Sequence, residues 1–168
     1  LNELIKEKEK SELAILSKNI ANSINKKTSI IYAGTAATFL VAQRWKTQIN
    51  ENAKSKAYTG YMPEVHHNEI LSWEADSEGS KNNFILIFLK DLKDHLQVQK
   101  RYDLTKTILG DEVEIIEVEN ITSNNPIKEI FYLTLLGDLV SVYQAELIGI
   151  DPYDIKKIEN LKQMLKGN

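Results

Sequence analysis

The chain has 168 residues, of which 42% are hydrophobic and 27% are charged, and its formal net charge is −3. This length suits one globular domain, and the charge balance lacks the basic excess of a nucleic-acid-binding protein. The chain has no cysteine, which excludes disulfides and cysteine-based metal or redox chemistry and is compatible with a reducing cytoplasm. No apolar run approaches the roughly 20 residues that cross a bilayer. From the charge balance we therefore expect no nucleic acid as a partner, and from the lack of such a run we expect no membrane.

Helix-like and strand-like segments alternate along the chain, which is typical of an α/β sheet with crossover helices. The predicted elements are, in chain order, a helix over 1–25, a strand over 29–33, a helix from 35 to about 53, a short strand at 57–58, a short helix over 66–73, a turn at 76–83, a strand over 84–89, a helix over 90–109, a strand over 113–118, a helix from 126 to near 149 and a helix from 152 to about 165. The expected fold is one open parallel sheet flanked by helices, with ligands in the loops after the strands. Because the sequence starts at Leu1 and lacks a signal peptide, we interpret the chain as a piece of a longer polypeptide.

Polar side chains of functional types concentrate between residues 44 and 73, where His66 and His67 stand side by side. Proton transfer at neutral pH uses a carboxylate base and an imidazole, and this stretch offers both, with Glu51 among its carboxylates. A helix with charges on one face is more often simply solvated, and composition alone favours that interpretation. Spacing therefore makes these residues candidates and no more.

A metal site is not expected, because consecutive histidines diverge on a helix and only the distant His95 remains. We predict neither a metal nor an organic cofactor. Gly34 and Thr35 follow a strand and resemble an anion-binding helix start, which makes them candidates for substrate binding. They lack the further glycines of a Rossmann or Walker loop, so a plain strand-to-helix turn is the alternative.

The segment RWKTQINENAKSKAYTGYMPEVHHNEILSWE, residues 44–74, resembles the signature block of the bifunctional phosphoglucose/phosphomannose isomerases. That family shows a similar RWK, then Asn-Glu-Asn-x-Lys, then Pro-Glu-x-x-His-Asn-Glu-Ile and a tryptophan. Residues 137–162 look like the family's C-terminal end, so the resemblance covers its second sugar-isomerase (SIS) domain, a flavodoxin-like three-layer sandwich. His66 stands where the family usually has Asn, which makes His67 the histidine that matches the motif.

The resemblance implies an aldose–ketose isomerase that interconverts fructose 6-phosphate with glucose 6-phosphate and mannose 6-phosphate through a cis-enediol. Glu51 matches the family's base, His67 the residue that assists ring opening, and Lys162 a second ring-opening group, although Lys156, Lys157 and Lys166 lie nearby. Arg44 is a candidate for approaching the substrate, with the positioning of helices as the favoured alternative.

The resemblance also implies that the phosphate-binding loops lie in an N-terminal SIS domain that precedes this chain. It implies a cytoplasmic homodimer with the active site at the interface, so His67 acts either in its own chain's site or in the partner's. We expect the isolated chain to fold but not to isomerise. Two alternatives are a regulatory module that binds a phosphosugar without catalysis, against which the joint presence of Glu51 and His67 argues, and a structural dimerisation domain.

Overall fold

Four parallel strands form the centre of the protein. The computed structural model describes residues 12–34, 36–120 and 125–167. The strands are β1 (Thr28–Ala33), β2 (Ala57–Tyr61), β3 (Phe84–Lys90) and β4 (Glu114–Glu119), in the order β2-β1-β3-β4 across the sheet. Ile31 of β1 pairs with Thr59 on one side and Ile87 on the other, and Ile87 pairs with Ile116 of β4. The predicted open parallel sheet is confirmed, and the short strand predicted at 57–58 is a complete edge strand.

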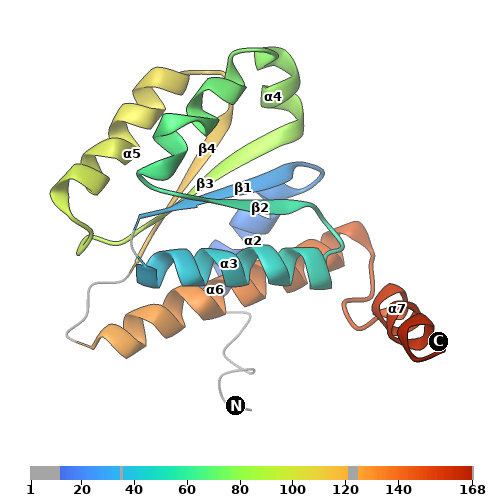
Figure 1. Ribbon diagram of the computed structural model, residues 1–168. Coiled ribbons are helices and arrows are strands. Elements are labelled where there is room, and N and C mark those ends of the chain that lie inside the picture. Colours follow the sequence, from blue (N-terminus) through green and yellow to red (C-terminus); the bar gives the residue numbers. More distant parts are fainter. Residues whose placement is uncertain (1–11, 35, 121–124, 168) are drawn as a thin grey trace.

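Helices cover both faces of this sheet (Figure 1). On one face lie α2 (Glu12–Ile24), α3 (Ala36–Asn52) and α6 (Pro126–Ile148). On the other lie the two 3-10 helices η1 (Glu64–His67) and η2 (Glu69–Trp73), together with α4 (Ser77–Asn83) and α5 (Leu96–Leu109). The last helix, α7 (Lys156–Lys166), extends away from these layers. The architecture is therefore a three-layer sandwich with one projecting helix.

The central strand β3 separates two hydrophobic cores. Its alternate side chains point to opposite faces, so Ile85, Ile87 and Leu89 join the core with α2, α3 and α6, while Leu86 and Phe88 join the other core. All five of these side chains are fully buried. A continuous apolar run is what a parallel strand covered on both faces requires, which explains why the sequence predicted this strand correctly.

The turn predicted at residues 76–83 is wrong, because this segment forms helix α4. The Asp76 carboxylate accepts a hydrogen bond from the Gly79 amide at 2.9 Å and thereby caps the helix. Ser80 is the buried residue of this short, polar helix, so no apolar stripe announces it. In the sequence, the aspartate at position 76 is the residue that indicates the start of this helix.

Two other predicted helices have different limits in the structure. The helix predicted over 90–109 begins only at Leu96, where the His95 imidazole accepts a hydrogen bond from the Gln97 amide at 3.1 Å. The helix predicted over 66–73 is the end of η1 followed by η2. Asn68 separates the two with φ −150° and ψ −60°, and its side chain accepts from the Glu69 amide at 2.6 Å. Asn68 therefore ends one short helix and caps the next.

Gly137→Ala is expected to destabilise the fold by about 1–3 kcal/mol, although alanine favours helices by about 1 kcal/mol. The reason is that a Cβ atom at Gly137 would overlap the Trp45 ring. That ring is fully buried, and its Nε1 donates a hydrogen bond to the Leu133 carbonyl at 2.8 Å, so it cannot move aside. Urea unfolding measures the change. Gly167→Ala is the control, since the nearest atom to a Cβ there lies 3.7 Å away; equal stability of the two variants would contradict this account of the packing.

Candidate active site

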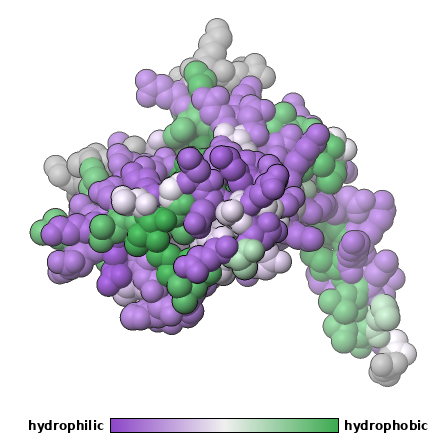
Figure 2. All heavy atoms as spheres, turned by 90° about the horizontal axis from the view of Figure 1, so that it is seen from above, coloured by the Kyte–Doolittle hydropathy of each residue, from purple (hydrophilic) through white to green (hydrophobic). Residues whose placement is uncertain are grey.

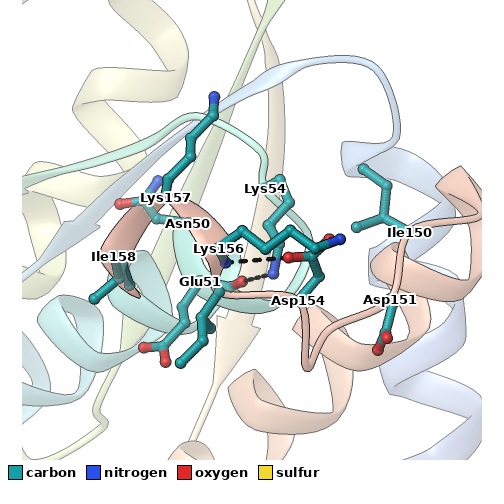
Figure 3. Close-up of a pocket in the computed structure, with 10 residues that line it drawn as sticks. Asn50, Glu51, Lys54, Ile150, Asp151, Asp154, Lys156, Lys157 and Ile158 are labelled. Carbon is teal, nitrogen blue, oxygen red and sulfur yellow. Dashed lines mark hydrogen bonds and ion pairs between the residues drawn. The ribbon is translucent and has the colours of Figure 1, made fainter. Parts of the chain in front are cut away.

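Glu51 lies in the last turn of α3 and lines a cavity of about 720 Å³ (Figure 3). The fully buried Ile49 precedes it by two residues, which is about 200° around the helix, so Glu51 faces away from the core and is exposed. The cavity lies between the end of α3 and the segment that joins α6 to α7. Its lining residues are Asn50, Glu51, Lys54, Ile150, Asp151, Asp154, Ile155, Lys156, Lys157 and Ile158.

The charged groups around this cavity come from two segments that are about 100 residues apart in the sequence. Lys54 Nζ donates hydrogen bonds to the Glu51 carbonyl at 2.6 Å and to the Pro152 carbonyl at 3.3 Å. The Lys156 ammonium donates to the Asp154 carboxylate at 2.9 Å, and this hydrogen bond raises the pKa of Lys156 and lowers that of Asp154. Three carboxylates (Glu51, Asp151 and Asp154) and three ammonium groups (Lys54, Lys156 and Lys157) thus line one space. The site offers both a base for proton transfer and positive groups for a developing negative charge.

His66 is fixed between η1 and α5 by two hydrogen bonds. Its Nδ1 lies 3.2 Å from Arg101 Nη1, and its Nε2 lies 2.7 Å from Thr105 Oγ1. A guanidinium only donates, so Nδ1 accepts and Nε2 carries the hydrogen that it donates to Thr105. Thr105 in turn donates to the Arg101 carbonyl at 2.6 Å. Burial lowers the pKa of His66, and the neighbouring charges of Arg101 and His67 lower it further. His66 is therefore a neutral structural residue.

His67 differs from His66 in its exposure and in its contacts. It is exposed at the end of η1, and within the described residues its side chain has no hydrogen-bond partner. A cavity of about 330 Å³ beside η2 and α5 is lined by His66, Arg101 and Thr105, and His67 does not line it. His67 is thus free to reach a substrate or a neighbouring molecule, whereas His66 is not.

We predict that acid destabilises the protein partly through His66. The pKa of His66 is lower in the folded chain than in the unfolded chain, where it has the ordinary histidine value of 6.5. As the pH falls through 6.5, the unfolded chain therefore binds more protons than the folded chain. The stability that His66 contributes is therefore complete above about pH 7 and is lost progressively below it. Urea midpoints of the parent and of His66→Gln, measured between about pH 7.5 and 5, test this. A difference between the two midpoints that does not change with pH would contradict it.

Glu51 and His67 lie on opposite faces of the sheet. Helix α3 runs antiparallel to β2: the rings of Phe39 and Tyr61 lie 5.3 Å apart at one end, and Asn50 donates to the Ser55 carbonyl at 2.8 Å at the other. Glu51 is about 18 Å along α3 from Phe39. The 3-10 helix η1, which ends at His67, instead packs into the hydrophobic core on the other face of the sheet. Within one chain, Glu51 therefore lines the cavity at the end of α3 and His67 does not.

The remaining candidates are placed as follows. The Arg44 guanidinium binds both oxygens of the Asp138 carboxylate, at 2.9 and 2.8 Å, and so connects α3 to α6. Lys162 is exposed on α7 and is not among the cavity-lining residues, whereas Lys156 and Lys157 are. Arg44 thus makes a contact that connects two helices. Lys156 and Lys157, and not Lys162, line the same cavity as Glu51.

The end of β1 is occupied by a carboxylate. A Cβ atom at Gly34 would lie 2.6 Å from an oxygen of the buried Asp94. A carboxylate suits the positive end of a helix, and here it lies beside the start of α3, where an anionic ligand was expected. Thr35, the other candidate at this turn, lies outside the described residues.

Within the described residues, no group of three or more His, Asp or Glu side chains is placed to hold a metal ion. No helix in the described part of the chain is long and apolar enough to cross a membrane.

Comparison with known proteins identifies the family. The family of bacterial phospho-glucose isomerase C-terminal SIS domains matches residues 14–165. The bifunctional phosphoglucose/phosphomannose isomerase of Aquifex aeolicus is 42% identical over 149 residues, which are 89% of this chain and 46% of that protein. The enzyme of the same name from Caldicellulosiruptor bescii is 36% identical over 150 residues, which are 89% of this chain and 44% of that protein. The chain therefore spans about half the length of the curated relatives it matches.

A solved structure supports the same assignment of the fold. The crystal structure of a glucose-6-phosphate isomerase like protein from Thermus thermophilus matches with a TM-score of 0.65, over 81% of this chain and 44% of that one. Its sequence identity is 21%, so this likeness shows the fold alone. The resemblance predicted from residues 44–74 and 137–162 is confirmed: the chain belongs to the family of bacterial phospho-glucose isomerase C-terminal SIS domains.

Proposed function

We propose that this chain is the C-terminal half of a two-domain isomerase that interconverts fructose 6-phosphate with glucose 6-phosphate and mannose 6-phosphate. The observation that carries the proposal is the exposed Glu51 carboxylate beside a 720 Å³ cavity whose other wall bears lysines. The names of the Aquifex and Caldicellulosiruptor relatives support the choice of substrates. The family resemblance is our reason for placing the phosphate-binding residues in the N-terminal half, and the buried Asp94 carboxylate beside Gly34 at the end of β1 supports this choice.

Glu51 moves the proton between C1 and C2 of the open-chain sugar. Its carboxylate takes the proton from C2 of the aldose, the C2–H electrons form the C1–C2 double bond, and the C1 carbonyl electrons move to O1 to give a cis-enediolate. The proton then returns to C1 and the O2 hydroxyl proton passes to O1, which leaves the C2 carbonyl of the ketose. The carbonyl itself acidifies the neighbouring C–H bond, so the reaction needs no oxidant, metal or organic cofactor. Ammonium groups beside Glu51 stabilise the enediolate oxygen. Return of the proton to either face of C2, after rotation about C2–C3, gives both glucose and mannose phosphates.

His67 assists ring opening in the site of a second copy of the protein. Its imidazole is exposed and has no hydrogen-bond partner among the residues that the structure describes, and it lies on the face of the sheet opposite Glu51. A homodimer that places η1 of one copy near the end of α3 of the other would complete the site. Two such sites would form in each symmetric dimer.

Turnover of fructose 6-phosphate by the full-length protein tests the proposed function. In D₂O, with a chelator present, we expect both aldose 6-phosphates to form, with solvent deuterium at C2, because the enediol route exchanges the transferred proton. Nuclear magnetic resonance of the products measures both outcomes. Binding of the sugar phosphate without turnover would favour a regulatory module, and activity that a chelator abolishes and a divalent ion restores would contradict the metal-free mechanism.

A further inference from the structure

Lys54 occupies a backbone position that normally favours glycine. Its φ is 53°, in the left-handed region, immediately after the end of α3. The Ser55 amide donates back to the Ile49 carbonyl at 3.3 Å, so the chain after Lys54 stays hydrogen-bonded to the last turns of α3. A non-glycine residue in this conformation is strained, and an observed strain of this kind is a reason to ask what the side chain contributes.

The Lys54 side chain joins two segments of the cavity wall. Its Nζ donates to the Glu51 carbonyl at 2.6 Å, one of the carbonyls that the end of a helix leaves without a partner. The same Nζ donates to the Pro152 carbonyl at 3.3 Å, across 98 positions of sequence. A glycine at position 54 would fit the backbone better but could form neither hydrogen bond.

Helix α7 depends on this connection for its orientation. None of its residues is buried, and its apolar residues Ile158, Leu161, Met164 and Leu165 are exposed along the projecting helix (Figure 2). Among the hydrogen bonds of the described residues, the bond from Lys54 to Pro152 is the one that joins residues 151–167 to the rest of the chain. The other side-chain hydrogen bonds of this segment are internal, between Asp151 and Tyr153 and between Asp154 and Lys156.

We propose that Lys54 is a positioning residue, whose ammonium holds the segment before α7 against the end of α3 so that this segment and Glu51 line one cavity. This inference rests on the proposed role of Glu51 in proton transfer. Displacement of a catalytic wall by even 1 Å can cost about a hundredfold in rate, which is why a connection outside the reacting groups matters.

The test uses Lys54→Gly, Lys54→Arg and the matched control Lys26→Gly. Lys26 is the other non-glycine residue with positive φ in the described chain, at 65°, and it does not line the cavity. Both glycine variants relieve backbone strain, so we expect equal or higher unfolding midpoints for both. Amide hydrogen exchange of residues 151–167 should accelerate at least about tenfold in Lys54→Gly. It should stay at the parental rate in Lys54→Arg, whose guanidinium can still donate to both carbonyls, and in Lys26→Gly.

In the full-length protein, Lys54→Gly should lower kcat/KM for fructose 6-phosphate at least about tenfold, whereas Lys54→Arg and Lys26→Gly keep it within about threefold. Parental exchange of residues 151–167 in Lys54→Gly would overturn the proposal. Faster exchange with unchanged kcat/KM would overturn it too, because the connection would then not serve the reaction. Full activity of Glu51→Gln would refute the role of Glu51 separately, since the exchange measurement does not depend on turnover.

Discussion

Glu51→Gln is expected to lower the kcat of the full-length protein for fructose 6-phosphate at least about a thousandfold while the fold stays intact. Glutamine has nearly the same shape as glutamate but cannot accept the C2 proton. The Glu51 side chain is exposed and makes no core contact, so the substitution removes no packing. Steady-state kinetics measure the loss, and thermal unfolding shows that the fold is kept.

Glu146→Gln is the matched control for this experiment. Glu146 is also an exposed glutamate in the last turn of a helix, but it does not line the cavity. We expect its kcat to stay within about twofold of the parent, as surface substitutions usually do. A Glu51→Gln variant that retains more than about a tenth of the parental kcat would show that Glu51 is only a surface residue.

His67→Ala is expected to reduce turnover of the closed-ring substrate about a hundredfold, within the range of a lost general acid or base. His66→Ala should reduce turnover less but lower the urea midpoint, because it leaves Arg101 and Thr105 without their shared partner. Kinetics and urea unfolding of both variants separate the two roles. An equal or larger kinetic effect at His66 would reverse the assignment.

The sequence predicted the sheet well because its strands carry the pattern that burial on two faces requires. The apolar run of β3 and the alternation of strands with helices were sufficient for the order of elements. Helix α4 was missed because it is polar and seven residues long, and only its cap at Asp76 identifies it. The last helix begins at Lys156 and not at the predicted 152, because the Asp151 carboxylate accepts from the Tyr153 amide in a turn.

The candidate site could be predicted only in part. The motif made Glu51 and His67 candidates, and both assignments stay predictions. It could not show that the two residues lie on opposite faces of the sheet. That separation arises because β2 is followed by a crossover to the face opposite α3. The contact of Lys54 with Pro152 spans 98 positions, and no spacing rule reaches so far.

Because we propose that each active site combines Glu51 of one copy with His67 of another, a hybrid dimer of two variants should recover activity that neither variant has alone. Glu51→Gln and His67→Ala chains of the full-length protein, each with its own affinity tag, are co-expressed, and the dimers that carry both tags are purified. Each variant alone should be nearly inactive. In the hybrid, one site contains both intact residues and the other contains neither, so about half of the parental activity per dimer should return. A hybrid as inactive as its two parents would show that Glu51 and His67 act within one chain, and would contradict the account.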